Sequence, residues 1–333
     1  MTTEQLTFKT HPTARRWLAR TARCALPFLM AWVVLPASAH NNNAYVANQF
    51  GNTVSVIDMT TNTVTATVPV GTVPLGIAVS PDGSVVYVAN ANANTVSVIN
   101  AATNTVTATV PVEKAPAAVV VSPNGADVYV ANANASTVSV IDTATNTIIA
   151  TVPVGSVPLS IAVSPDGVHV YTGNAGDNTV SVIDTATHAV TATVPVAATP
   201  YGVVVGPLGA RLYVASFDSN DVSVIDTSTN TVTATVAAGN GPDAITISPI
   251  GIPVYAANFT DSTVSVINPF NKTVIATVPV GEYPGAIAVN RHSGRVYVAN
   301  VGSNTVSVIN PFTNKVIATV NAGRGPTAVA IQP

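Results

Sequence analysis

Few side chains in this sequence have the chemistry of a catalyst or a metal ligand. The only cysteine is Cys24, and the histidines beyond residue 40 are His169, His188 and His292, each beside turn-forming residues. There is no HExxH or CxxCH, no GxSxG with triad partners, no P-loop and no EF-hand loop. Catalytic and metal centres need reactive groups to converge, so we predict no catalytic residue, no metal site and no cofactor.

Four aspartates, Asp58, Asp142, Asp184 and Asp226, recur at equivalent positions and could be taken for a ring of carboxylates. In the other periods of the same pattern the position holds asparagine, at Asn100, Asn268 and Asn310. Asp and Asn both accept a hydrogen bond from a following backbone N–H in a turn, but only Asp carries charge. Their exchange predicts a structural role in turns.

Seven tyrosines mark an internal repeat. They lie 42 residues apart without insertion or deletion, at Tyr45, Tyr87, Tyr129, Tyr171, Tyr213, Tyr255 and Tyr297. Each period contains four short runs of apolar and β-branched residues separated by turn signals, which in one period are Leu75 to Ser80, Val85 to Ala89, Thr95 to Ile99 and Thr105 to Val110. Four strands in about 42 residues are typical of one propeller blade. We therefore predict an all-β, seven-bladed β-propeller with four antiparallel strands per blade.

The two ends of the repeat region predict how the ring closes. Residues 40–333 number 294, which is seven periods of 42. The region starts in a second strand (Ala44 to Ala47) and finishes in a first strand (Thr327 to Ile331). One C-terminal strand and three N-terminal strands would then complete a single blade and leave no open edge.

The first 39 residues have the order of a secretory signal peptide. A basic front with Arg15 and Arg16 precedes an apolar run from Ala25 to Leu35 and the small residues Ala37-Ser38-Ala39. The apolar run is too short for a membrane-spanning helix. We predict a signal peptide over 1–39, a propeller over 40–333, no transmembrane anchor after cleavage, and a periplasmic, extracellular or cell-surface location. Both Sec and twin-arginine export stay open.

Charge argues against nucleic-acid binding. Residues 40–333 keep seven basic and fourteen acidic side chains, a formal charge of −7. Binding to a phosphate backbone needs a basic stripe, so nucleic acid is not a favoured partner.

The repeats resemble the YVTN-repeat β-propellers of bacterial and archaeal cell-surface and periplasmic proteins. The residues that carry this resemblance are the YVAN tetrapeptides, TVSVID at Thr53 to Asp58 and Thr137 to Asp142, and TVTATVPVG at Thr63 to Gly71. The resemblance implies the propeller fold over the whole of residues 40–333. For function it implies several possibilities, including surface-layer proteins, periplasmic binding proteins, lactonase-like enzymes and proteins of quinone-cofactor pathways.

A binding site is expected where the repeats differ from one another. The loops before each first strand and those between second and third strands share one end of the propeller, and there aromatics alternate with charged residues. The candidate rim residues are Phe50, Glu113, Lys114, Asp177, Tyr201, Phe217, Asp218, Asp243, Phe259, Asp261, Glu282, Tyr283 and Arg324. Neutral drift on tolerant loops is the alternative interpretation.

Three functions fit these observations. The first is a non-catalytic exported module that binds a protein or glycan at the cell envelope. The second is a lactonase-like hydrolase; the predicted channel strands (IAVS, VVVS and similar) hold almost nothing ionisable, so its site would need Glu113, Asp243, Glu282 and Arg324. The third is an accessory subunit of a periplasmic redox complex.

Overall fold

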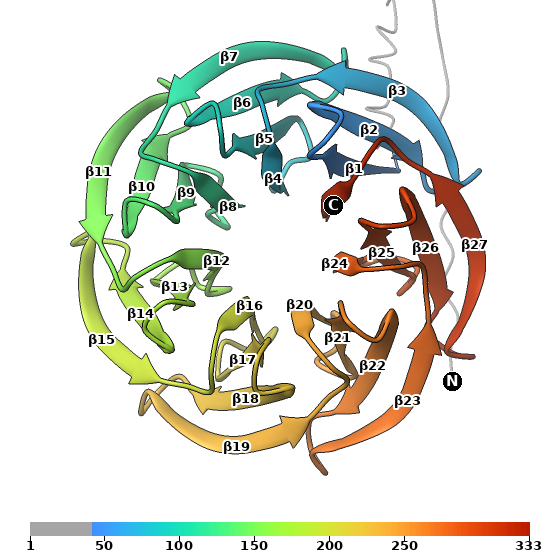
Figure 1. Ribbon diagram of the computed structural model, residues 1–333. Helices are drawn as coiled ribbons and strands as arrows, with labels where there is room; N and C mark the ends of the chain where they lie inside the picture. Colours follow the sequence, from blue (N-terminus) through green and yellow to red (C-terminus); the bar gives the residue numbers. More distant parts are fainter. Residues whose placement is uncertain (1–41) are drawn as a thin grey trace, which may run out of the picture. The chain divides into compact units, whose positions relative to one another are not determined.

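The computed structural model describes residues 42–333, which form 28 strands and no helix. The strands make seven four-stranded antiparallel sheets arranged around a central axis (Figure 1). This confirms the predicted seven-bladed β-propeller. The predicted signal peptide, residues 1–39, lies outside the described residues. Within residues 42–333 no helix has the length and apolarity needed to cross a membrane.

Each blade contributes one strand to each of four concentric positions. The first, innermost strands are β4 (Pro74–Val79), β8 (Pro116–Val121), β12 (Pro158–Val163), β16 (Pro200–Val205), β20 (Pro242–Ile247), β24 (Pro284–Val289) and β28 (Pro326–Ile331). The second strands are β1 (Asn43–Asn48), β5 (Val85–Asn90), β9 (Asp127–Asn132), β13 (His169–Asn174), β17 (Arg211–Ser216), β21 (Val254–Asn258) and β25 (Val296–Asn300).

The other two positions complete the blades. The third strands are β2 (Thr53–Asp58), β6 (Thr95–Asn100), β10 (Thr137–Asp142), β14 (Thr179–Asp184), β18 (Asp221–Asp226), β22 (Thr263–Asn268) and β26 (Thr305–Asn310). The outer strands are β3 (Thr63–Pro69), β7 (Thr105–Pro111), β11 (Thr147–Pro153), β15 (Ala189–Pro195), β19 (Thr231–Ala237), β23 (Thr273–Pro279) and β27 (Lys315–Asn321). Blade 1 is β28 with β1–β3, and blades 2 to 7 follow in chain order.

The core lies between the blades rather than within one sheet. In β2, Val54, Ser55, Val56 and Ile57 are all buried, although successive side chains point to opposite faces. Both faces of a third strand are therefore covered by neighbouring blades. The outer strands face solvent and bury only one residue each, such as Val68 in β3. This difference in burial explains why apolar residues occupy both faces of the third strands. In the outer strands, by contrast, threonine alternates with apolar residues.

The ring closes as predicted. β28 pairs antiparallel with β1, with Val329 opposite Val46, and β1 continues the sheet through β2 and β3. The side chain of Gln332 then donates a hydrogen bond to the carbonyl of Gly83 in blade 2, at 2.7 Å. Blade 1 is thus built from both ends of the described chain, and its sheet has no missing strand.

The recurring Asp and Asn residues hold turns, as predicted. Asn100 accepts hydrogen bonds from the N–H groups of Ala102 and Thr103, both at 3.0 Å. Asp142 likewise accepts hydrogen bonds from the N–H and the hydroxyl of Thr145, and these bonds lower the pKa of the Asp142 carboxyl. Either residue type satisfies this geometry, which accounts for their exchange between periods.

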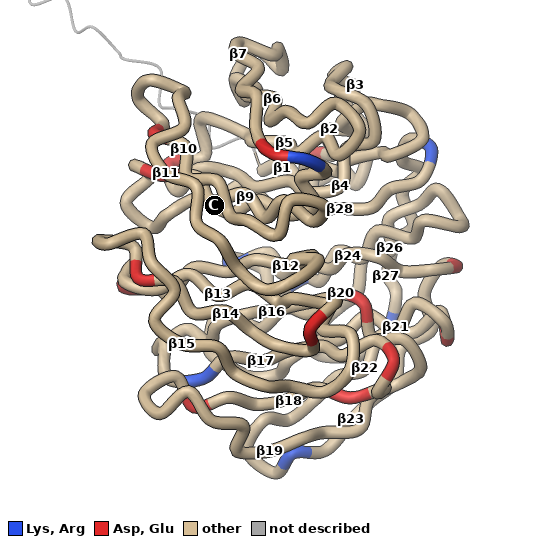
Figure 2. Tube along the Cα trace, turned by 60° about the vertical axis from the view of Figure 1, so that its left-hand side comes forward, with Lys and Arg blue, Asp and Glu red and all other residues tan. Residues whose placement is uncertain are grey.

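The two ends of the propeller differ in construction. At one end, the turns after first and third strands bond to each other, for example Ala101 N–H to Ser84 O at 2.9 Å. At the opposite end, called the loop end below, the segment before each first strand bonds to the loop after each second strand, for example Phe259 N–H to Gly241 O at 2.7 Å. Charged residues are sparse along the whole trace (Figure 2).

Candidate binding site at the channel mouth

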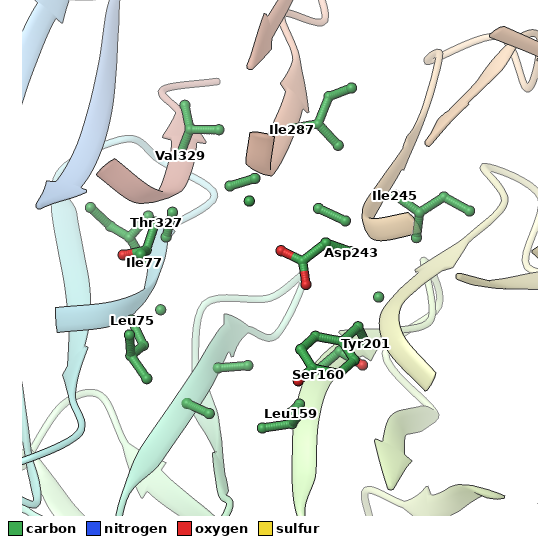
Figure 3. Close-up of a pocket in the computed structure, with 18 of the residues that line it drawn as sticks. Leu75, Ile77, Leu159, Ser160, Tyr201, Asp243, Ile245, Ile287, Thr327 and Val329 are labelled. Atoms are coloured by element: carbon green, nitrogen blue, oxygen red, sulfur yellow. The ribbon is translucent and has the colours of Figure 1, made fainter. Parts of the chain in front are cut away.

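The inner strands of all seven blades surround a central channel that widens into a cavity of about 500 Å³ at the loop end. Its mouth is formed by seven residues, each of which follows the proline at the start of a first strand. We call these residues the channel ring; they are Leu75, Ala117, Leu159, Tyr201, Asp243, Gly285 and Thr327. The rest of the lining is mostly small or aliphatic, with Gln49, Ser160, Phe217 and Phe259 as the exceptions, and the one carboxylate among these described residues is Asp243 of the ring (Figure 3).

A repeated backbone device sets the direction in which each ring residue leaves its loop. The residue before each proline is left-handed, with φ between 53° and 65° at all seven positions. At five of them an asparagine of the preceding blade accepts a hydrogen bond from its N–H, as Asn52 does from Val73 at 2.9 Å. The proline then fixes φ for the first residue of the strand. The repeat therefore presents seven ring positions identically and varies only the side chain.

Asp243 is the carboxylate of the channel ring. Its side chain points into the cavity (Figure 3), and a Cβ built on neighbouring Gly285 would lie 3.4 Å from its Oδ2. Its surface is half-buried because the oxygens face the open channel, yet the surrounding blades displace most of the water around it. This burial alone raises the pKa of Asp243 to about 7. The group is thus a carboxyl without a compensating partner among residues 42–333.

Four aromatic rings, called the aromatic row, lie beside Asp243. Tyr201 and Phe217 have centroids 5.1 Å apart, Phe217 and Phe259 6.2 Å, and Phe259 and Tyr283 5.0 Å with an interplanar angle of 25°. These are ordinary distances for interacting aromatic pairs. Burial, and then the charges of Asp243 and Asp218, raise the pKa of Tyr201. The row spans the loop end of blades 5 and 6 and the start of blade 7.

Two of the candidate rim residues stand in a different place from the one predicted. Tyr201 and Asp243 were expected on loops, with only the IAVS-like runs lining the channel; they are instead the second residues of β16 and β20 and line the channel themselves. The loop placement was wrong, because each inner strand begins at its proline and the residue after it belongs to the sheet, as the predicted first strands beginning at Leu75 and Thr327 already implied. The channel consequently does hold an ionisable group.

Three predicted rim carboxylates are engaged in loop hydrogen bonds. Asp177 accepts from the N–H of Ser156, Asp218 from the hydroxyl of Thr199, and Asp261 from the N–H and side-chain amide of Asn240. In each case the bond joins the two loops of one blade. These aspartates therefore shape the rim, and less of their hydrogen-bonding capacity is free for a ligand.

The remaining candidates lie at the loop end but outside the aromatic row. Phe50 is 61% exposed and sits against Gly325, and its N–H bonds to the carbonyl of Arg324, so these two form a separate corner of blade 1. Glu113 and Lys114 are exposed between β7 and β8. Glu282 is held through its N–H by Ser303 at 2.7 Å, which leaves its carboxylate facing solvent.

Sequence reasoning missed the channel ring as a set. Leu75, Leu159, Gly285 and Thr327 line the cavity with Asp243 but had not been considered for a site. The signal was present: the position after the repeated proline is filled by six different residue types in seven periods, within otherwise regular text. Among residues 42–333, no group of three or more His, Cys, Asp or Glu side chains has the arrangement of a metal site.

Comparison with known proteins agrees with this architecture. A family model described as "YNCE-like beta-propeller" matches residues 82–173. This match and the seven-bladed ring support a YVTN-like propeller family. No curated protein matches the chain.

Two solved structures have folds similar to this propeller. Hydrazine synthase of Kuenenia stuttgartiensis shares 22% identity over 81% of this chain and 92% of that chain, with a TM-score of 0.75. A functionally unknown protein from Desulfotomaculum acetoxidans DSM 771 shares 19% identity over 87% of this chain and 98% of that chain, with a TM-score of 0.77. At these identities the likeness concerns the fold alone.

Proposed function

We propose that this propeller is a non-catalytic, exported binding module that holds a protein or glycan partner at the cell envelope through its loop end. The observation that carries the proposal is the aromatic row beside the open channel mouth, where Tyr201 is 36% and Tyr283 48% exposed. Exposed aromatics grouped around a concave centre are typical of recognition surfaces. Export rests on the sequence of residues 1–39.

The proposal is tested with residues 40–333 as immobilised bait for a solubilised extract of the native cell envelope. One variant carries Tyr201→Ala and Tyr283→Ala, and the matched control carries Phe312→Ala, an aromatic that is 89% exposed in the turn between β26 and β27. A partner retained by the wild type and the control but lost from the double variant supports the proposal. A partner retained equally by all three, or none retained at all, contradicts it.

A hydrolase with its site in the channel is a second candidate, favoured by one observation. A carboxyl whose pKa lies near 7 and which faces a cavity is suited to general acid–base catalysis. The hydroxyls of Ser160 and Thr327 also line the cavity, but among residues 42–333 neither is hydrogen-bonded to Asp243, so the structure shows no nucleophile–base pair there. Lactone turnover that is lost on Asp243→Asn, or stoichiometric divalent metal in the purified protein, would favour the hydrolase over the binding module.

A subunit of a periplasmic redox complex is the third candidate. The chain shares its fold with the Kuenenia hydrazine synthase, but a shared fold does not imply a shared function. A redox centre would have to belong to a partner, and co-purification of a coloured protein with the native chain is the result that would favour this function.

A further inference from the structure

The channel mouth is electrostatically incomplete. Within the part of the chain that the structure describes, Asp243 is the one acidic side chain in the lining, and no Lys, Arg or His lines the cavity with it. Transferring a carboxylate from water into such a site is unfavourable unless an opposite charge or hydrogen-bond donors accompany it. A ligand that brings its own positive charge would supply what the protein does not.

The aromatic row adds a second reason for a cation. The face of an aromatic ring carries partial negative charge and attracts an ammonium group within about 6 Å of its centroid. Tyr201 and Asp243 are the ring residues of adjacent blades and line the same cavity (Figure 3), and contacts between rings continue from Tyr201 through Phe217 and Phe259 to Tyr283. A carboxylate that shares a cavity with aromatic rings such as Tyr201, Phe217 and Phe259 is suited to organic cations rather than to metal ions, because rings offer no ligand atom.

The other side of the channel ring is apolar. Leu75 and Leu159 line the cavity from blades 2 and 4 (Figure 3), and Ala117 lines it from blade 3. Gly285 leaves the space beside the Asp243 carboxylate open, because any Cβ there would contact it. A cavity of about 500 Å³ has room for a small organic molecule but not for a folded domain.

We propose that the channel mouth binds an organic ammonium group, with the cation between Asp243 and Tyr201 and its alkyl portion against Leu75 and Leu159. This inference deepens the binding function proposed above and rests on it. The group could belong to a free alkylamine or quaternary amine, or to a lysine side chain of a bound protein. All share a positive nitrogen on a short aliphatic chain.

The direct test is calorimetric titration of the purified chain with choline and with hexylamine. Neutral 3,3-dimethylbutan-1-ol and hexan-1-ol and the anion hexanoate serve as matched ligands of similar shape. We expect the two cations to bind, the alcohols to bind about tenfold more weakly or not at all, and hexanoate not to bind. Equal binding of hexylamine and hexan-1-ol would overturn the proposal, since the cavity would then be recognising only the alkyl chain. Failure of both cations to bind would overturn it equally.

Two variants and one control locate the site. Asp243→Asn should weaken hexylamine binding about tenfold. Asp177→Asn removes one charge from the same end of the propeller, and its amide oxygen can still accept the bond from Ser156, so binding should be unchanged. Gly285→Val keeps the charge but fills the space beside Oδ2 and should also weaken binding. Unchanged affinity in both Asp243→Asn and Gly285→Val, with circular dichroism showing folded protein, would contradict the assignment.

The source of the cation is decided with the captured partner. Hexylamine that elutes the partner from the bait indicates a lysine side chain, whereas hexylamine that binds without eluting it indicates a free amine. Partner capture that persists in a chain unable to bind any amine would reject the ammonium site and leave the binding module standing. Amine binding without any captured partner would reject the envelope partner instead.

Discussion

The side-chain oxygen of Asn220 in blade 5 accepts a hydrogen bond from the backbone N–H of Gly241 at the start of blade 6, at 2.8 Å. Gly241 is left-handed, with φ of 65°, and is followed by Pro242 and then by Asp243. A side chain of one blade thus fixes the turn from which the next blade presents its channel residue. The same geometry recurs at Asn52, Asn94, Asn178 and Asn304.

Asn220→Ala should lower the free energy of unfolding by about 1 kcal/mol, because the N–H of Gly241 loses its acceptor in a partly buried loop. Ser262 occupies the equivalent position in blade 6, is also left-handed, and forms no such bond with Tyr283. Ser262→Ala is therefore the matched control and should lose clearly less. Urea unfolding of the two variants gives the comparison; equal losses would mean that the hydrogen bond does not stabilise the turn.

Val157→Gly should leave the propeller as stable as the wild type or stabilise it. Val157 is β-branched and has φ of 53°, which is an unfavourable backbone conformation for such a residue. Its side chain is 37% exposed, so replacing it opens no closed core cavity. Relief of roughly 1–2 kcal/mol of left-handed strain is offset by about 0.5–1 kcal/mol of lost chain entropy for glycine. Val163→Gly, in β12, should instead destabilise by about 2 kcal/mol or more. A thermal shift of the same sign in both variants would contradict this account.

Gly173 and Ser160 compensate each other in blade 4. They are paired across β12 and β13, and a Cβ on Gly173 would lie 2.7 Å from the Ser160 hydroxyl. Gly173→Ala should therefore cost about 1–3 kcal/mol by overpacking. Adding Ser160→Gly reproduces the Gly76–Ala89 pair of blade 2 and should restore most of the loss. A double variant no more stable than Gly173→Ala alone would show that the contact is not the cause.

The fold was predictable because its determinants repeat. Tyr45 and its six counterparts each occupy the same buried position in a second strand. The strands predicted for one 42-residue period are therefore the strands of all seven blades. Closure of blade 1 followed from the same arithmetic, since the missing first strand could come only from Thr327 to Ile331. The periodicity of the sequence was thus sufficient to predict nearly all of the architecture.

The site was only partly predictable, because it depends on contacts between non-repeating residues. Phe217 and Phe259 are 42 residues apart, and whether their rings meet is decided by the angle and spacing of neighbouring blades. The place of Asp243 in an inner strand could have been predicted from its repeat equivalents Leu75 and Thr327, but the residues that share the cavity with it could not. The hydrogen bonds that engage Asp177 and Asp261 were invisible for the same reason.

Asp243 should make the stability of the propeller depend on pH. Burial raises the pKa of its carboxyl to about 7 in the folded chain, against an ordinary value of about 3.9 in the unfolded chain. The folded chain binds the Asp243 proton more tightly than the unfolded chain does. The stability that this proton gives to the fold is therefore fully present below about pH 4 and is lost as the pH rises through about 7. Asp243→Asn, which resembles the protonated carboxyl, should therefore be more stable than the wild type by a margin that grows by about 1–2 kcal/mol from pH 5 to pH 8, because channel water screens part of the charge.

Urea unfolding of both proteins at pH 5 and pH 8 isolates this effect, because every other titrating group is present in both and cancels in the difference. Among the described residues that line the cavity with Asp243, the other titratable side chain is Tyr201 on β16, and β24 contributes only uncharged residues such as Gly285. The pKa of Tyr201 is raised, so its phenol stays neutral throughout this range. A difference between the two proteins that does not change from pH 5 to pH 8 would show that Asp243 ionises normally and that the channel mouth is well hydrated.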